Sequence, residues 1–146
     1  MNLDIKLVPP KQVPSWVPGL RPYLKKSEFW TKGRAQATDI IEYLMDGRMN
    51  LWAVVDPDDF TPYGYVITEF RDYARCRALV IQYCAGENNY MRHVEDQMYD
   101  TLERFARDGG CEVIEFFGRK GWEKHVKSHG YDMNMVIYEK FLGANP

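Results

Sequence analysis

The hydrophobic pattern is clearest over residues 79–118, where it predicts a strand, a turn, a long amphipathic helix and a second strand. Ala78–Cys84 is nearly all apolar, as expected for a strand that is buried on both faces. In the helix, apolar residues recur at three- and four-residue steps: Met91, Val94, Met98, Leu102 and Phe105. Gly109-Gly110 can take the positive φ that ends a helix, and Cys111–Phe117 follows as a strand. The pattern therefore predicts a parallel βαβ unit with a right-handed crossover.

Shorter patterns predict the remaining strands. These segments alternate apolar and polar residues or are largely apolar: Leu3–Val8, Leu51–Val55, Tyr63–Phe70 and Met133–Phe141. The turn signal of residues 56–59 joins the second and third segments, so we expect these two strands to form an antiparallel hairpin. Together with the βαβ unit, they predict a mixed and mostly antiparallel sheet.

The helices outside the central unit have weaker signals. Prolines interrupt residues 11–33, where we expect one or two short helices, the clearest over Pro22–Phe29. Thr38 is a good N-cap for a helix that continues to residue 45. A last short helix is expected within residues 118–130. No repeat or linker interrupts this order, so all 146 residues are predicted to form one α/β domain flanked by helices.

Composition narrows the class of protein. The chain is 45% hydrophobic and 14% aromatic, which is typical of a globular protein. Its formal net charge of -2 gives no general attraction to nucleic acid or to an anionic membrane. The three cysteines are odd in number and scattered, which indicates reduced, structural thiols. With neither a signal-peptide pattern nor a membrane-spanning run, we expect a cytoplasmic protein, although the interior of a virion would give the same composition.

The order of elements resembles the GNAT superfamily of acyl-CoA-dependent N-acyltransferases over almost the whole chain. The most specific match is residues 102–113, LERFARDGGCEV, which resembles the end of the long helix of this family and the start of the next strand. Residues 118–131 resemble its penultimate helix and terminal Gly-aromatic pair, and residues 136–141 resemble its last strand. The resemblance implies a GNAT-like fold, acetyl-CoA as the cofactor and an amine as the acceptor substrate.

In that family, a turn of the form Arg/Gln-x-x-Gly-x-Gly/Ala binds the cofactor pyrophosphate through backbone N–H groups at a helix N-terminus. Alignment places this motif on residues 90–95, where Tyr90, His93 and Glu95 replace the Arg/Gln and the two small residues. Side chains at these positions hold a phosphate away from the amides, and Glu95 adds a negative charge. Arg92 is the one cation there that can help to bind an anion. By position in the motif, the cofactor-binding residues are Tyr83, Cys84, Ala85, Arg92, His93, Val94 and Glu95.

The catalytic groups that the family commonly uses also differ. A central-strand carboxylate often serves as the base, and a tyrosine four residues before the Gly-aromatic pair often serves as the acid. The central strand here carries no carboxylate, and the tyrosine position is Val126. We take Glu69 as the candidate base and Tyr138 as the candidate acid. The alternatives have ordinary structural explanations as strand or core residues: Glu115, Tyr83 and Tyr131.

Other constellations are weaker. His125 and His129 share a helix face at the spacing of a two-histidine metal grip, but no third ligand is evident, so no metal is predicted. A Cys84–His93 nucleophile pair lacks a third residue that would orient the base. The basic residues of 119–127 are interpreted as a solvated helix face. The N-terminal third is rich in aromatic residues: Trp16, Tyr23, Phe29 and Trp30. The sequence is equally consistent with an acceptor pocket, a helix-on-sheet core and a protein-binding patch.

Two functions follow. The first is an acetyl-CoA-dependent N-acetyltransferase whose pyrophosphate turn is degenerate, with weak or no activity. The second is a non-catalytic scaffold or protein-interaction module on the same fold. In its small size and degenerate turn, the chain is similar to GNAT-like proteins of tailed bacteriophages, some of them internal virion proteins. The partner is an amine substrate in the first function and a protein in the second; neither function involves nucleic acid or a membrane.

Overall fold

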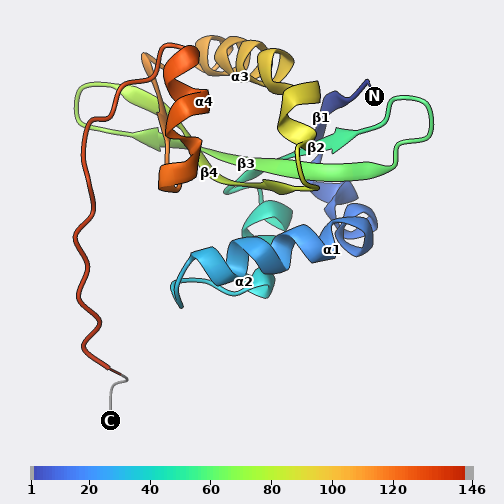
Figure 1. The fold of residues 1–146 in the computed structure, drawn as a ribbon, viewed down its shortest axis with the longest axis horizontal. Helices are drawn as coiled ribbons and strands as arrows, with labels where there is room; N and C mark the ends of the chain where they lie inside the picture. Colours follow the sequence, from blue (N-terminus) through green and yellow to red (C-terminus); the bar gives the residue numbers. More distant parts are fainter. Residues whose placement is uncertain (1, 144–146) are drawn as a thin grey trace.

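The computed structural model describes residues 2–143, in which five strands form one sheet. The strands follow one another across the sheet in chain order: β1 (Asp4–Val8), β2 (Asn50–Val55), β3 (Pro62–Asp72), β4 (Arg77–Gly86) and β5 (Val113–Phe116). The first three pairings are antiparallel, and β4 and β5 are parallel (Figure 1). The predicted mixed sheet, its hairpin and its parallel βαβ unit are therefore confirmed.

Helices cover both faces of the sheet. The α-helices are α1 (Val13–Trp30), α2 (Ala37–Met45), α3 (Glu95–Asp108) and α4 (Glu123–Ser128). Short 3-10 helices precede three of them: η1 (Pro10–Gln12), η2 (Tyr90–His93) and η3 (Lys120–Trp122). Figure 1 shows α1 and α2 on one face of the sheet and α3 and α4 on the other. Within residues 2–143, no helix is both long and apolar enough to cross a membrane.

Each face of the sheet has its own buried core. Because side chains alternate along a strand, Val66 of β3 packs toward α3, whereas Tyr65 and Ile67 pack toward α1 and α2. Met98 and Leu102 fill the α3 side, in agreement with the predicted apolar stripe. A core on both faces explains why β4 is a continuous apolar run rather than an alternating one.

Helix α1 differs from the prediction of one or two short helices. It is a single helix of 18 residues that contains Pro18 and Pro22. Pro14 lies in the first turn, where a missing backbone donor costs little. Beyond it, Leu20 and Leu24 are buried against the sheet. This packing compensates for the backbone hydrogen bonds that the internal prolines remove.

The starts of α2 and α3 also differ from the predictions. Helix α2 begins at Ala37, because the backbone N–H of Gln36 donates to the carboxylate of Asp39 at 2.9 Å, so Thr38 is not the N-cap. Helix α3 begins only at Glu95. The residues before it form η2, which starts after Asn89, a residue with a φ of 61°. The turn between β4 and α3 is therefore longer and more structured than the apolar periodicity indicates.

The predicted final strand, Met133–Phe141, is wrong for the described chain. Residues 131–143 form no helix or strand. Figure 1 shows this part of the chain running from α4 past the level of α1 and α2, away from the sheet. No strand within residues 2–143 pairs with it, although the apolar pattern is that of a strand. Its large apolar side chains are exposed: Met133, Met135, Val136, Ile137, Tyr138, Phe141 and Leu142.

Candidate functional site at the end of strand β4

The backbones of β4 and β5 separate half-way along β4. Their pairing begins at Ala78 and Val113 and ends at Ile81 and Phe116, beside a last backbone hydrogen bond from Phe117 to Ile81. A bulge in the β3–β4 pairing leaves Gln82 without a partner residue at this point. The end of β4, the β4–α3 turn (residues 86–95) and the start of α3 therefore form a distinct region, in which a ligand site of a parallel βαβ unit is expected.

Tyr90 fills the space above the end of β4. It is buried, and its hydroxyl lies 3.1 Å from the sulfur of Cys84. Its ring covers Gly64 and Gly86, which face each other across β3 and β4. A Cβ added to Gly86 would lie 2.6 Å from the ring, too close for any real contact. The two glycines thus make room for the chain's own tyrosine, which occupies the space above the sheet.

The Tyr90–Cys84 pair is uncharged at neutral pH. Burial raises the pKa of the Cys84 thiol to about 12, although the hydrogen bond to Tyr90 and the nearby Arg119 guanidinium lower it by smaller amounts. Burial likewise raises the pKa of Tyr90 well above its ordinary value. A thiol in this state is a poor nucleophile. The imidazole of His93 contacts Arg92 instead, at 3.2 Å, which agrees with a structural role for Cys84.

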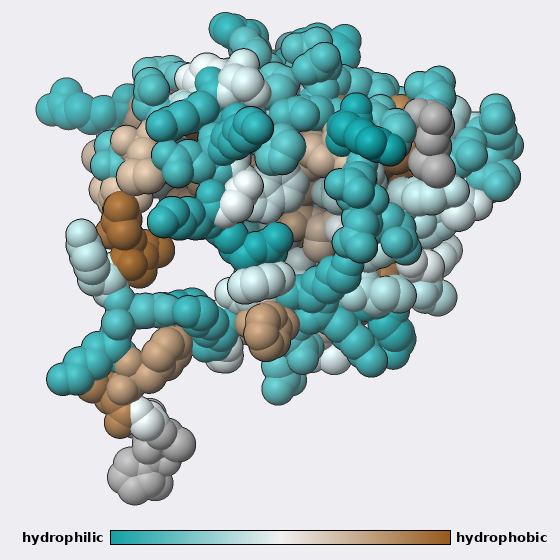
Figure 2. Space-filling view, viewed as in Figure 1, coloured by the Kyte–Doolittle hydropathy of each residue, from teal (hydrophilic) through white to brown (hydrophobic). Residues whose placement is uncertain are grey.

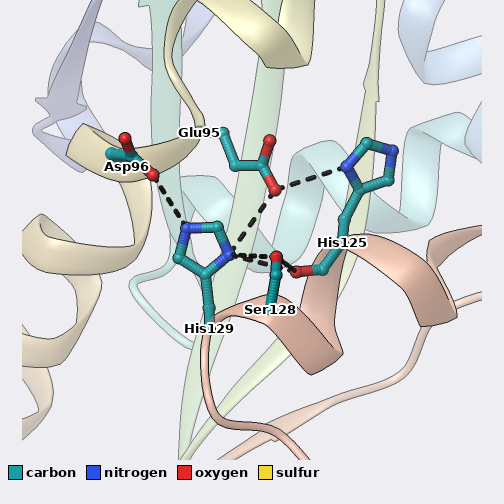
Figure 3. Close-up of polar contacts among 5 residues, drawn as sticks. All are labelled: Glu95, Asp96, His125, Ser128 and His129. Atoms are coloured by element: carbon teal, nitrogen blue, oxygen red, sulfur yellow. Dashed lines mark hydrogen bonds and ion pairs between the residues drawn. The ribbon is translucent and has the colours of Figure 1, made fainter.

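At the start of α3, two carboxylates face two histidines of the α4 region (Figure 3). His125 Nδ1 lies 3.3 Å from Glu95 Oε1, and His129 Nε2 lies 3.0 Å from Asp96 Oδ1. His129 Nδ1 is also 3.5 Å from Glu95 Oε1, and its ring stacks on Tyr99 with 4.0 Å between centroids. We call these four residues, Glu95, Asp96, His125 and His129, the carboxylate–histidine cluster; it joins α4 to the first turn of α3.

His129 is favoured in its protonated form. Burial alone would lower its pKa, but the hydrogen bonds to the His125 carbonyl and to Asp96, together with the charge of Glu95, outweigh that effect and raise it. Nδ1 donates to the His125 carbonyl oxygen at 3.0 Å, so it is not available as a base for Ser128, 3.2 Å away. The hydroxyl of Ser128 itself donates to the same carbonyl at 2.7 Å. The arrangement is therefore not a Ser-His-acid triad.

The cluster occupies the positive end of the α3 dipole. The first backbone N–H groups of a helix attract anions, and Glu95 and Asp96 supply negative charge there from within the chain. Each carboxylate contacts a histidine of the α4 region. In residues 2–143, no three His, Cys, Asp or Glu side chains are placed to hold a metal ion. The cluster is thus an internal arrangement at the start of α3, where the sequence alignment predicts the pyrophosphate motif.

Helix α1 covers the end of β4 from the other face. Lys26 Nζ donates to the Gly86 carbonyl at 3.0 Å, and the Tyr23 hydroxyl donates to Glu87 Oε1 at 2.9 Å. Burial, followed by the hydrogen bond to Glu87, raises the pKa of Tyr23 to about 12, so the hydroxyl stays protonated. These contacts join α1 to the β4–α3 turn.

One buried polar group in this region has no hydrogen-bond partner in the described chain. The hydroxyl of Tyr99 is buried, and the Tyr99 ring stacks on His129 and lies against the Tyr131 ring. Burial, followed by the nearby Cys84, raises the pKa of Tyr99 above its ordinary value. It is the only site-region tyrosine within residues 2–143 whose buried hydroxyl is left unsatisfied, and neither the motif nor the helical spacing singles it out.

The predicted catalytic pair is not assembled as a site. Glu69 lies on β3, where its carboxylate is 2.6 Å from Arg71 and accepts a hydrogen bond from Gln82. Tyr138 is 93% exposed on the C-terminal segment, outside the sheet. The alternative base Glu115 accepts a hydrogen bond from the Tyr73 hydroxyl at 2.7 Å. The catalytic roles of Glu69 and Tyr138 stay predictions.

The seven residues predicted from the cofactor motif lie in three different environments. Tyr83 and Ala85 pack toward α1 and α2, whereas Cys84 and Val94 are buried on the α3 side. Of the three polar residues, Arg92 is exposed, whereas His93 and Glu95 are half-buried. The residues that sequence reasoning did not assign to the site are Lys26, Tyr90, Asp96, Tyr99, His125 and His129. The four-residue spacing of the histidines and the acidic helix start were the available signals.

The aromatic residues of the N-terminal third also lie in different environments. Tyr23 belongs to the core, whereas Phe29 and Trp30 are exposed and meet edge to face at 5.1 Å. The guanidinium of Arg119 lies over the Trp30 ring at 4.2 Å. A hollow of about 430 Å³ lies beside Trp16 and shares no lining residue with the β4–α3 turn. The aromatic residues thus do not form one acceptor pocket.

Comparison with known proteins identifies the fold. No family model matches the sequence, and no curated protein matches it either. Among solved structures, a ribosomal-protein-alanine N-acetyltransferase from Brucella melitensis is similar with a TM-score of 0.68 and 15% identity, over 97% of this chain and 99% of that one.

Two further acetyltransferases are equally similar. A predicted acetyltransferase from Clostridium acetobutylicum, solved with acetyl-CoA, has a TM-score of 0.68 and 14% identity, over 96% of both chains. An aminoglycoside acetyltransferase from an uncultured soil metagenomic sample, solved with sisomicin, has a TM-score of 0.68 and 13% identity, over 97% of both chains. The protein therefore has the GNAT-like fold of these acetyltransferases.

Proposed function

We propose that this protein belongs to the N-acetyltransferase class but that its own side chains occupy the acetyl-CoA site, so that acetyl transfer is weak or absent. The observation that carries the proposal is the β4–α3 turn. Tyr90 fills the space above Gly86, and the carboxylate–histidine cluster occupies the start of α3. The fold supports the class of reaction, and the closed turn supports its reduced form.

The residues present do not fit a bound pyrophosphate. The diphosphate would approach Glu95, a carboxylate with a side chain only 20% exposed that already contacts two imidazoles. A diphosphate and a nearby carboxylate repel each other strongly when both are partly removed from water. Arg92 is exposed and contacts His93, and it is the one arginine or lysine beside Glu95 and Asp96 in residues 90–97.

A non-catalytic interaction module is the second candidate. The exposed apolar side chains of the C-terminal segment favour it, because apolar surface of this extent usually marks an interaction site. In this function the fold supplies a rigid scaffold and the turn is an ordinary part of the core. The bacteriophage source and the virion or cytoplasmic location stay predictions from the sequence, as does the identity of an amine acceptor.

Calorimetry and thermal-shift measurements with acetyl-CoA and with desulfo-CoA test the proposal. We expect the wild-type protein to show neither heat nor stabilisation at millimolar cofactor, because a ligand that binds the native state must raise its stability. The double variant His93→Gly, Glu95→Ala restores both small residues of the motif and should gain measurable binding. Glu103→Ala is the matched control, since it removes an exposed carboxylate further along the same helix.

Two results would contradict the proposal. Micromolar binding by the wild-type protein that disappears in Arg92→Glu would show an open anion site and would favour an active acetyltransferase. Failure of the folded double variant to bind would show that the two side chains are not what closes the turn.

A further inference from the structure

The hollow beside Trp16 lies near the edge strand β1, away from the β4–α3 turn. Three parts of the chain meet there: β1, the start of α1, and the loop that joins β2 to β3 (residues 56–61). Its volume is about 430 Å³, and its apolar lining comes from Trp16, Gly19, Phe60 and Pro62. We call it the Trp16 hollow. This volume is in the range of roughly 300–1,000 Å³ that is typical of small-molecule sites.

Phe60 is held beside the hollow by a closed loop. Its φ is 62°, in the left-handed region that a bulky side chain rarely adopts. Two backbone hydrogen bonds fix the loop: Phe60 N–H donates to the Asp56 carbonyl at 2.8 Å, and Asp56 N–H donates to the Thr61 carbonyl at 3.0 Å. The ring stays 51% exposed instead of entering the core. Strained residues of this kind cluster at ligand sites, where the surrounding structure keeps them in place.

Trp16 supplies the second aromatic ring from a rigid element. It lies on α1, is half-buried and packs against the core on the α1–α2 side of the sheet. Gly19, one turn further along, allows this helix to lie close to β3, because a Cβ there would be 2.8 Å from Pro62 Cγ. Two aromatic rings from distant parts of the chain therefore line one hollow before any ligand is bound. Such a lining suits a flat apolar ring.

The rim of the hollow carries one cation without a counter-charge. Lys6 is the only charged residue in its lining, and within residues 2–143 the Lys6 ammonium lies 4.6 Å from the ring centre of Phe60 and forms no ion pair. Gln12 adds an exposed carboxamide. Ser15 donates its hydroxyl hydrogen to the Gln12 carbonyl at 2.7 Å, which leaves its oxygen as an acceptor. The rim therefore offers positive charge, N–H donors and one acceptor.

The aspartates of the β2–β3 loop do not cancel this charge inside the hollow. None of the three belongs to its lining. Asp56 accepts a hydrogen bond from the Asp58 N–H, and Asp59 accepts one from the Thr61 N–H, both at 2.9 Å. These two carboxylates thus face the backbone of their own loop. Lys6 sets the charge of the lining, and that charge favours an anion.

The Trp16 hollow is also separate from the large exposed apolar surface of the molecule. Figure 1 shows the β2–β3 loop and the C-terminal segment (residues 133–142) at opposite ends of the view. In Figure 2, strongly hydrophobic side chains lie exposed on that segment. A broad apolar surface fits a protein partner. The hollow is smaller, and polar groups share its lining, so it fits a small ligand with both an apolar and a charged part.

We propose that the Trp16 hollow binds a small organic anion in which a flat apolar ring carries a carboxylate. The ring lies against Trp16 and Phe60, and the carboxylate accepts hydrogen bonds from the Lys6 ammonium and the Gln12 carboxamide. This inference does not depend on the proposed function, because no residue that lines the hollow belongs to the β4–α3 turn. It gives the chain a ligand site whether or not acetyl-CoA binds.

Three probes separate the ring from the charge. Indole-3-acetate has both, indole-3-acetamide has the ring alone, and acetate has the charge alone. Two-dimensional NMR of the full chain would follow the Trp16 indole N–H and the Gly19 amide as each probe is added to millimolar concentration. We expect saturable shifts of both signals with indole-3-acetate at submillimolar Kd, weaker shifts with the acetamide, and none with acetate.

Two variants test the assigned contacts. Lys6→Met should weaken indole-3-acetate about three- to tenfold and leave indole-3-acetamide unchanged, because it removes only the charged partner. Phe60→Gly should weaken both ring probes, and it should fold normally because glycine adopts this φ without strain. Lys11→Met is the matched control: Lys11 is exposed next to Gln12 but does not line the hollow, so the Kd should not change.

Three results would overturn the inference. The first is the absence of saturable shifts at Trp16 and Gly19 with indole-3-acetate. The second is equal binding of the acid and the amide, or binding that Lys6→Met and Phe60→Gly leave unchanged, since the assigned contacts would then not hold the ligand. The third is binding of a proline-rich peptide in place of indole-3-acetate, because the hollow would then be part of a protein-binding groove.

Discussion

The β4–α3 turn and the C-terminal segment differ in how far the rest of the chain covers their side chains. In the turn, Tyr90 covers the facing glycines and the carboxylate–histidine cluster occupies the helix start, so few groups are left for a ligand. In the C-terminal segment, apolar side chains such as Ile137 and Tyr138 have almost nothing over them. A ligand at the turn must displace the chain's own groups, whereas a partner at the segment only covers what is already exposed.

Packing contributes more than charge to the stability of the turn. Ion pairs between exposed side chains contribute only about 0–1 kcal/mol. Asp96 is 94% exposed, so its contact with His129 belongs to this weak class. A buried aromatic side chain contributes several times more, roughly 3–5 kcal/mol when it is cut back to alanine. We therefore expect Tyr90 to dominate the stability of the turn and the cluster to adjust it.

The largest effect is expected from Tyr90→Ala. The change empties the space above Gly86 and should lower the free energy of unfolding by about 3–5 kcal/mol in urea denaturation. Tyr138→Ala, on the exposed C-terminal segment, is the control and should change it by no more than about 0.5 kcal/mol. A loss below about 1 kcal/mol for Tyr90→Ala would mean that the ring is not part of the core.

Gly86→Ala comes next. Its new methyl group meets both the Tyr90 ring and the Tyr63 carbonyl at 2.6 Å, so overpacking should cost about 1–3 kcal/mol. Gly121→Ala is the matched control, because a Cβ there meets no atom within 4 Å. Urea denaturation of the two variants should differ clearly; equal stabilities would contradict the tight packing of Tyr90 on β4.

The smallest effect concerns pH. Because the folded pKa of His129 is raised above the unfolded value of about 6.5, its contribution is complete below that pH and is lost as pH rises through the folded pKa. Wild type should therefore exceed His129→Gln in stability by up to about 1 kcal/mol near pH 6, and by less near pH 8.5. Lys124→Gln, on the same helix, should show no such pH dependence. If the stability difference between wild type and His129→Gln instead grew with pH, the pKa of His129 would be lowered on folding rather than raised.

Sequence pattern predicted the sheet because its signals are local. The apolar run of β4 and the Gly109-Gly110 stop of α3 each follow from the chemistry of a few neighbouring residues. The single helix α1 was not predicted, because the packing that offsets Pro18 and Pro22 comes from distant strands. The missing final strand has the same cause, since strand formation needs a partner as well as an apolar pattern.

The site was predicted only in outline. Residues 90–95, on which the motif alignment falls, lie between β4 and α3, and Glu95 is the first residue of α3; their role in binding a cofactor stays a prediction. The role of Tyr90 depends on Gly64, a residue of β3 distant in sequence, and that of Glu95 depends on His125 and His129 of the α4 region. Such long-range contacts leave no periodic signal. The helical spacing of the two histidines indicated a shared face, but not what that face contacts.

Titration of the amides at the start of α3 tests the central claim most directly. Two-dimensional NMR of the wild-type protein would follow the backbone N–H signals of Glu95, Asp96 and Gln97 as acetyl-CoA is added to millimolar concentration. Because the chain's own carboxylates and Tyr90 occupy this place, we predict that these signals do not move. Saturable shifts of these three amides at micromolar cofactor would show that the turn binds the pyrophosphate and would contradict the account.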